Sequence, residues 1–400
     1  MTERAEEQRF ETLAVHAGAD PDPSTGAVVP AIQPATTFKQ DAVGSPRQGF
    51  EYARSDNPTR RALEATMAAL EGGDHGLAFA SGLAATQNLL YLLDPGDRLV
   101  MTDDAYGGTW RLARQVMARY GIESQAVDLR DLDAVRRALA GGSAKPGGGS
   151  WPPARMLWIE TPTNPLLKVA DIRALSGAAA SVGAMTVVDN TFATPFLQRP
   201  LELGADVVLH SATKYLGGHS DVVGGVLVTS SASLAERLRF TQNAAGAVPS
   251  PFDCWLLMRG IRTLALRMER ACSSAASIAE WLAAQPQVEH VHYPGLAQGA
   301  QRELALRQMR LPGAIVSFQI RGGEAAAHRF AASTRLFTLA ESLGAVESLV
   351  EVPAAMTHLS VSDTPMAVPA NLIRLSVGVE HVDDLLADLA VALSAGVPTG

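Results

Sequence analysis

The chain has 400 residues, of which 47% are hydrophobic and 18% are charged, and its formal net charge is −8. This composition is typical of a folded protein and excludes disordered and collagen-like chains. The acidic balance, with no run of lysine and arginine, argues against partners such as nucleic acid or anionic membranes that bind basic surfaces.

Three further features bear on where the protein works. No apolar stretch approaches the roughly 20 residues needed to span a bilayer. The start of the chain, residues 1–9, lacks the apolar region of a secretion signal. The two cysteines, Cys254 and Cys272, provide neither a disulfide framework nor the spacing of a metal site. We therefore expect a cytoplasmic protein without a metal centre.

The N-terminal 60 residues are rich in turn formers and show little helical periodicity, which predicts an extended arm over residues 1–60. From about Arg61 the pattern becomes helical, with apolar residues at helical spacing up to Gly72 and Gly73. At 400 residues, two domains beyond the arm are expected.

Short apolar runs then alternate with longer helical stretches, which predicts a mostly parallel sheet wrapped by helices in a domain spanning residues 61–250. The predicted strands are residues 76–79, 98–101, 155–159, 185–189, 207–209 and 226–228. The glycine-rich and proline-rich residues 141–153 read as a surface loop. Residues 251–400 begin with a long helical segment and contain two further strands, 315–320 and 373–376, which predicts a smaller α+β domain.

Lys214 follows the apolar run 205–210 and precedes Gly217 and Gly218. A lysine at the end of a buried strand is poorly hydrated, so its amine is shifted towards the neutral, nucleophilic form that a Schiff-base lysine needs. Taken alone, it also fits the description of an ordinary surface lysine.

Three upstream features strengthen the case. Asp189 ends another apolar strand, where open α/β sheets bind ligands, and its carboxylate could hold the pyridinium nitrogen of pyridoxal phosphate. Gly82 and Leu83 begin a helical stretch whose backbone N–H groups favour an anion, although a Ser-Gly step is also an ordinary N-cap. Tyr106 lies on a glycine-flanked turn, where its ring could stack on a planar cofactor or simply pack.

With these motifs in order, the chain resembles the Cys/Met-metabolism family of pyridoxal-phosphate enzymes, most closely its cystathionine γ-lyases and γ-synthases. The match runs from residues 12–18 to residues 373–380. The resemblance implies the aspartate aminotransferase-like fold type I, pyridoxal 5'-phosphate as cofactor, and a homotetramer built from two active dimers.

The resemblance also implies a set of cofactor-binding residues. Tyr52 and Arg54, on the arm, would reach the cofactor phosphate of a neighbouring subunit, where the guanidinium fork matches phosphate geometry. Two residues after Arg54 the chain departs from the family pattern, because Asp56 stands where relatives usually carry glycine. The remaining cofactor residues would be the lysine, aspartate, tyrosine and helix-start residues named above, with Ser211, Thr213, Asn164 and Glu160.

For the substrate, the resemblance implies that Arg374 binds the α-carboxylate. The other positions that match substrate residues of the family are Ser342, Thr357, Glu51, Arg111 and Glu341. Methionine γ-lyases usually carry cysteine at the position of Gly108, which disfavours that activity. Trp110 is bulkier than expected and could narrow the pocket for the end of the substrate that lies farthest from the cofactor.

The leading expectation is a γ-lyase that splits L-cystathionine into cysteine, 2-oxobutyrate and ammonia, with Lys214 and Tyr106 as its catalytic residues. A γ-synthase that joins a homoserine ester to cysteine uses the same residues and is the alternative. A cystathionine β-lyase and a homoserine-ester sulfhydrylase are more distant. A family-fold regulator without activity would lack the lysine, Asp189 or Arg374, and all three are present.

Overall fold

The computed structural model describes residues 8–358 and 367–397. Most of residues 1–9, where we expect no leader, lie outside this range. A seven-stranded sheet forms the centre of the larger domain, in the order β1-β7-β6-β5-β4-β2-β3. Only β7 runs antiparallel to its neighbours. The strands are β1 (His75–Phe79), β2 (Arg98–Thr102), β3 (Glu123–Val127), β4 (Met156–Glu160), β5 (Met185–Asp189), β6 (Val207–Ser211) and β7 (Gly225–Thr229).

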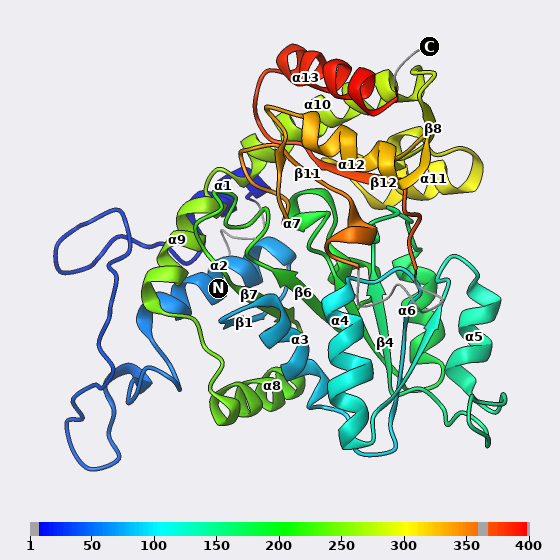
Figure 1. The fold of residues 1–400 in the computed structure, drawn as a ribbon. Helices are drawn as coiled ribbons and strands as arrows, with labels where there is room; N and C mark the ends of the chain where they lie inside the picture. The colour runs from blue at the N-terminus through cyan, green and yellow to red at the C-terminus, as the bar shows by residue number, and fades with distance from the viewer. Residues whose placement is uncertain (1–7, 359–366, 398–400) are drawn as a thin grey trace.

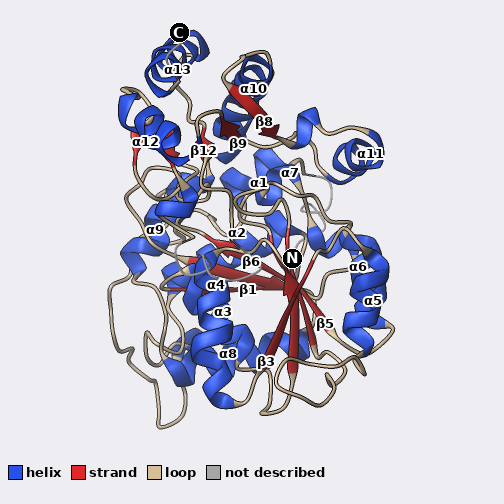
Figure 2. Cartoon of the chain, turned by 45° about the vertical axis from the view of Figure 1, so that its right-hand side comes forward, coloured by secondary structure: helices blue, strands red, loops and turns tan. Residues whose placement is uncertain are grey.

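Helices cover both faces of this sheet, because its central strands are apolar on both sides. One face packs against α3 (Gly82–Leu90), α4 (Gly107–Arg111) and α8 (Ala232–Ala245). The other face packs against α2 (Pro58–Glu71), α5 (Leu132–Ala140) and α6 (Ile172–Ala180). Figure 2 shows α3 and α8 on one side of the strands and α5 and α6 on the other. The predicted α/β class is confirmed.

The C-terminal part contains a second sheet of five strands, in the order β10-β11-β12-β9-β8, mostly antiparallel. Its strands are β8 (Val288–His292), β9 (Ile315–Ile320), β10 (Thr338–Leu339), β11 (Leu349–Glu351) and β12 (Leu372–Ser376). The helices of this part are α9 (Pro251–Ile261), α10 (Leu264–Ala283), α11 (Gly299–Gln308), α12 (Gly323–Ser333) and α13 (Val382–Gly396). Figure 1 shows this sheet with α10, α11, α12 and α13, coloured yellow-green to red, at one end of the molecule, whereas the green helix α9 lies beside α2.

The N-terminal segment is not extended throughout. Phe10, Leu13 and Ala14 form a buried stripe at helical spacing, and residues Phe10–His16 fold as α1 against α2. Between α1 and α2 the chain contains one short 3₁₀ turn, Arg47–Gly49, and forms the blue loops that project from the body in Figure 1. Among the described helices, none is long and apolar enough to cross a membrane.

Helix α2, which follows this segment, begins and ends at residues that favour helix ends. The side chain of Asn57 accepts hydrogen bonds from the backbone N–H groups of Thr59 and Arg60, and Pro58 occupies the first turn. Gly72 ends the helix with a φ of 71°, a left-handed conformation that favours glycine. The predicted helix ending at Gly72 and Gly73 is therefore present.

Candidate active site

A cavity of about 330 Å³ lies where the parallel strands of the large sheet end and the C-terminal part begins. Glu160, Asp189 and Ser211 are the last residues of β4, β5 and β6. The sequence-predicted residues that line the cavity are Gly82, Leu83, Tyr106, Glu160, Asn164, Asp189, Ser211, Thr213, Lys214, Glu341, Ser342, Thr357 and Arg374. Strand ends of an α/β sheet are where such folds hold ligands.

Lys214 lies on the turn after β6 and is half-buried. Its Nζ donates a hydrogen bond to Ser342 Oγ over 2.7 Å. Burial lowers the pKa of Lys214 to about 8, and the positive charge of Arg374 adds to this effect. A sizeable fraction of the amine is therefore neutral near physiological pH, which is the state in which an amine is a nucleophile.

Two carboxyl groups meet at one end of the cavity. β4 and β5 are parallel neighbours in register, which places Glu160 opposite Asp189. Burial raises the pKa of both groups, and the charge of Asp189 raises the pKa of Glu160 further. Thr191 partly offsets this for Asp189, since its hydroxyl and backbone N–H donate to Asp189 Oδ1 at 2.5 and 3.1 Å. This end of the cavity is short of positive charge.

The start of α3 forms the other end. Ser81 caps the helix by accepting the N–H of Ala84 at 3.0 Å, while the first N–H groups of a helix have no partner within it. A Cβ on Gly82 would come within 2.9 Å of Ser211 Cβ, so glycine is needed for the helix to lie this close to β6. The Thr213 hydroxyl lies nearby and contacts the Gly224 backbone.

These residues fit pyridoxal phosphate. A helix start with hydroxyl groups beside it suits a phosphate. A buried acid pair with raised pKa values suits a pyridinium nitrogen, whose proton would satisfy Asp189. Lys214, with its partly neutral amine, lines the cavity between them.

Glu160 joins the two turns that flank this cavity. Its Oε2 accepts the backbone N–H of Tyr106 at 2.9 Å, and its Oε1 accepts the backbone N–H of Asn164 at 3.0 Å. Burial raises the pKa of the Tyr106 hydroxyl, against an opposing effect from Arg111. A Cβ on Gly108 would lie 2.4 Å from Tyr106 Cε1, so glycine at this position leaves room for the ring.

Arg374 enters the cavity from β12. Its Nη1 donates to Asn164 Oδ1 at 2.8 Å, and its Nη2 donates to the backbone oxygen of Ser342 at 2.7 Å. The Asn164 amide nitrogen thus remains as a donor for a cofactor oxygen. Ser342 has a φ of 104°, which is strained for a residue with a side chain, and it touches both Arg374 and Lys214.

One residue of this cluster was missed by the sequence reasoning. Glu351, at the end of β11, is buried, and its Oε2 lies 3.0 Å from Arg374 Nη2. Thr357 Oγ1 lies within hydrogen-bond distance of Glu351 Oε1, at 2.8 Å. No hydrogen bond or ion pair of Thr357 with Arg374 or Lys214 is seen among the described residues, so its connection to Arg374 runs through Glu351.

Comparison with known proteins agrees with this geometry. The family model "Cys/Met metabolism PLP-dependent enzyme" matches residues 11–394. The chain belongs to this family. It is 54% identical to a cystathionine γ-synthase of Mycobacterium tuberculosis, over 96% of each chain. It is 47% identical to a cystathionine β-lyase of Coxiella burnetii, over 96% of this chain and 97% of the relative.

Among solved structures, a cystathionine γ-lyase from Lactobacillus plantarum complexed with L-serine superposes with a TM-score of 0.91. Its sequence is 43% identical, and the match covers 97% of this chain and 99% of that one. The protein is therefore a pyridoxal-phosphate enzyme of fold type I that acts as a carbon–sulfur lyase or synthase. The three relatives carry three different reaction names.

Two cofactor residues expected from the family lie away from the cavity. Tyr52 and Arg54 line a separate hollow of about 200 Å³ with residues such as Gly246 and Pro249. Both side chains are exposed, and the Arg54 guanidinium lies 5.3 Å from the centre of the Tyr52 ring. Within one chain, the structure does not bring them to Lys214.

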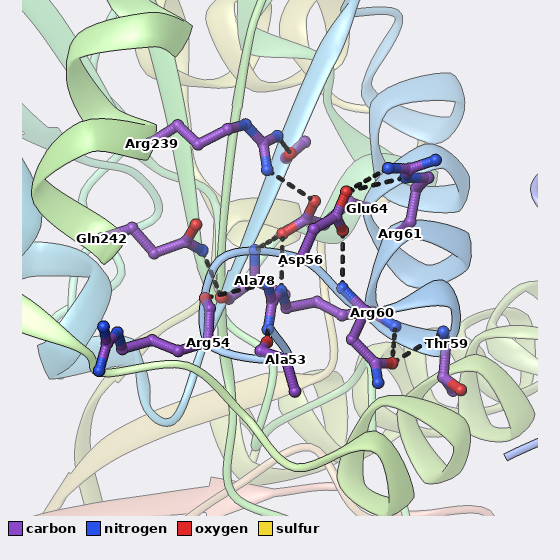
Figure 3. A network of polar contacts seen from close by, with 12 residues as sticks. Ala53, Arg54, Asp56, Thr59, Arg60, Arg61, Glu64, Ala78, Arg239 and Gln242 are labelled. Atoms are coloured by element: carbon purple, nitrogen blue, oxygen red, sulfur yellow. Dashed lines mark hydrogen bonds and ion pairs between the residues drawn. The ribbon is translucent and has the colours of Figure 1, made fainter. Parts of the chain in front are cut away.

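A buried arginine fixes the backbone that presents these two residues. Arg60 on α2 donates to the backbone oxygens of Ala53 and Arg54, at 2.7 and 3.2 Å. Figure 3 shows this contact and the Arg54 side chain extending away from the network. Asp56, where the family resemblance leads us to expect glycine, accepts a hydrogen bond from Arg61 Nε at 3.0 Å.

The residues expected to recognise the far end of the substrate, Glu51, Arg111 and Glu341, are divided in the same way. Glu341 lines the cavity, whereas Glu51 is exposed on the N-terminal segment and Arg111 is exposed at the end of α4. Trp110 does not narrow the cavity. It is buried among the core residues between α4 and the large sheet, with Arg114 over its ring.

Proposed function

We propose that the enzyme is a cystathionine γ-synthase, which joins an activated homoserine ester to L-cysteine. The observation that supports this choice is the 54% identity to a cystathionine γ-synthase over 96% of both chains. This exceeds the 47% identity to the β-lyase and the 43% identity to the γ-lyase. The cavity accommodates the chemistry that these reactions share.

In this proposal Arg374 binds the substrate α-carboxylate, which places the Cα–H bond near Lys214. The Lys214 amine takes the Cα proton as a general base and then moves a proton at Cβ. Bound pyridoxal phosphate supplies an electron sink for the charge released at Cα. Asp189 keeps a proton on the pyridine nitrogen, and Glu160 holds the Tyr106 and Asn164 backbones.

The Cγ–O bond of the ester then breaks, and its carboxylate leaves. The cysteine thiol gives up its proton as its sulfur forms the new Cγ–S bond, and protons return to Cβ and Cα. The released thiol proton matches the negative charge of the departing carboxylate, so atoms and charge balance. Tyr106 lines the cavity and is assigned to proton transfer near the leaving group. Burial raises its pKa, so the phenol is protonated at neutral pH and can donate.

The γ-lyase remains the second candidate, because the L. plantarum γ-lyase shares the fold at a TM-score of 0.91. The two reactions differ in whether a thiol attacks Cγ or the product is released by hydrolysis. Glu341 lines the cavity in a position to attract the ammonium group of either cysteine or cystathionine. The residues of the cavity therefore serve both reactions.

Product analysis by mass spectrometry separates the candidates. The cofactor-loaded enzyme is given O-succinylhomoserine or O-acetylhomoserine with cysteine in one reaction, and L-cystathionine alone in another. Net cystathionine in the first and little change in the second is the result expected of a γ-synthase. Cysteine with 2-oxobutyrate from cystathionine alone would favour the γ-lyase, and homocysteine with pyruvate would favour the β-lyase.

We also propose that the enzyme works in the cytoplasm as a homotetramer of two active dimers. The support for shared sites is that Arg60 fixes the backbone at Ala53 and Arg54, yet the side chains of Tyr52 and Arg54 lie outside their own chain's cavity. Sedimentation equilibrium of the loaded enzyme tests the assembly, and a monomer with full activity would contradict it.

A further inference from the structure

Glu351 is a buried acid beside the arginine that the proposed function assigns to the substrate carboxylate. It is 1% exposed and stands opposite Arg374 in the antiparallel pairing of β11 and β12. Arg374 lines the cavity, whereas Glu351 lies behind it. An ionised carboxylate here would cancel much of the charge that Arg374 needs to attract a substrate carboxylate.

The contact between the two groups is not the usual charge-assisted hydrogen bond. Glu351 Oε2 lies 3.0 Å from Arg374 Nη2, but among the described residues this oxygen accepts no aligned hydrogen bond. Arg374 donates from Nη1 to Asn164 and from Nη2 to Ser342 instead, and its Nε has no hydrogen-bond partner among the described residues. A buried carboxylate anion normally takes aligned N–H donors from a guanidinium this close.

A chain of hydrogen bonds leads away from the other oxygen. Glu351 Oε1 is 2.8 Å from Thr357 Oγ1, which is 2.9 Å from His358 Nδ1. His358 Nε2 is 3.2 Å from the backbone oxygen of Asn164. Each of these three contacts needs one hydrogen. The threonine hydroxyl and a neutral histidine supply two, so the chain holds one proton more than an anionic Glu351 allows.

That proton resides on either His358 or Glu351. His358 is 2% exposed, and burial together with the charge of Arg374 lowers its pKa to about 4. A second cation beside Arg374 is therefore disfavoured. Burial raises the pKa of Glu351, with Glu341 adding to this, although Arg374, Thr357 and Lys214 oppose it. Both directions favour a neutral acid.

We infer that Glu351 is protonated and that, as a neutral acid, it positions Arg374. Its hydroxyl donates to Thr357, which leaves the guanidinium of Arg374 its full charge for the substrate. The acid thus fills the space beside Arg374 and links β12 to the turn that carries Thr357 and His358. The inference rests on the proposed role of Arg374, but it does not depend on which transsulfuration reaction the enzyme catalyses.

Infrared difference spectroscopy tests the protonation state directly. Spectra of the protein, with and without cofactor, are compared between the wild type and Glu351→Gln at neutral pH, in H₂O and D₂O. We expect the wild type to show the C=O stretch of a protonated carboxylic acid that the variant lacks and that shifts in D₂O. Glu347→Gln, which changes an exposed acid four residues away, serves as the control and should retain this band.

The same variants give a kinetic readout that a merely structural role would not produce. We expect Glu351→Ala to raise KM by about tenfold. Because glutamine is neutral and can donate to Thr357, Glu351→Gln should keep KM close to the wild-type value. No carboxylic acid band in the wild type, or equal KM values for the two variants, would overturn the inference. If the alanine variant fails to fold, the infrared result still decides. Failure of the proposed γ-synthase reaction would appear only in the product analysis and would leave the band unchanged.

Discussion

The cavity and the N-terminal segment contain residues of the same expected site, but they are built differently. Lys214 and Asp189 lie inside the protein, each held by a hydroxyl group. Tyr52 and Arg54 are exposed, and only their backbone is fixed, by Arg60. The surroundings shift the pKa values of Lys214 and Asp189 in the cavity, whereas the side chains of Tyr52 and Arg54 remain exposed.

This difference is what a site shared between two chains requires, as we propose. We propose that each chain holds its own groups for proton transfer and that a neighbouring chain supplies the second phosphate contact. Experiments that separate the two regions are therefore more informative than those that simply abolish activity. The predictions below are arranged by the size of the effect we expect.

The largest effect is expected in the cavity. If Lys214 is the covalent anchor of the cofactor and the general base, as we propose, Lys214→Ala removes both, so turnover should fall by at least about a thousandfold. Reduction of the loaded enzyme with borohydride should fix the mass of the cofactor on the Lys214 peptide of the wild type and on no peptide of the variant. A cofactor mass on another lysine would show that the assignment is wrong.

If Arg54 binds the cofactor phosphate of a neighbouring chain, as we propose, Arg54→Ala should lower activity by on the order of a hundredfold, because charge-assisted hydrogen bonding to the phosphate is lost. Arg47→Ala, which changes an exposed arginine of the same segment, is the control and should have little effect. Titration of the apo protein with pyridoxal phosphate should show the loss as weaker cofactor binding.

Mixing inactive subunits sharpens the comparison between cavity and arm. If Arg54 serves a neighbouring chain, a dimer of one Lys214→Ala subunit and one Arg54→Ala subunit contains one intact site. Refolding the two variants together should then restore part of the wild-type activity, whereas each alone stays inactive. No recovery in mixtures shown to form hybrids would place Arg54 at the site of its own chain.

Sequence reasoning found the residues that follow apolar strands. Asp189 ends such a run and Lys214 lies on the turn that follows one, and the six predicted strands of the large sheet are all present. β3 was missed because its residues are partly exposed and polar, which leaves no apolar run. The antiparallel direction of β7 could not be read either, since a strand's direction depends on which neighbours it meets.

Residues defined by tertiary pairing were out of reach. Glu351 looks like an ordinary acid in a short apolar strand, and only the register of β11 with β12 brings it against Arg374. Helix α1 rests on three buried residues in a turn-rich segment, so its periodicity was too short to stand out. Trp110 follows Tyr106 closely in sequence but turns into the core.

Gly108 offers a test of how the Tyr106 ring is placed. A Cβ at this position would come within 2.4 Å of the ring, so Gly108→Ala should displace Tyr106 and lower kcat by about thirtyfold. Thermal stability should change little, because Tyr106 is partly exposed. Gly177→Ala on α6 is a matched control, since no heavy atom lies within 4 Å of a Cβ there.

The smallest effect concerns the protonation of Lys214. Only its neutral amine can attach the cofactor, and its pKa of about 8 lies below the ordinary value of 10.5. The rate at which the apo protein takes up pyridoxal phosphate should therefore rise by about tenfold between pH 7 and pH 9 and then level off. An ordinary lysine would give a rate that still climbs steeply above pH 9. Stopped-flow absorbance measures this rate, and a continued rise at high pH would show that the cavity does not depress the pKa of Lys214.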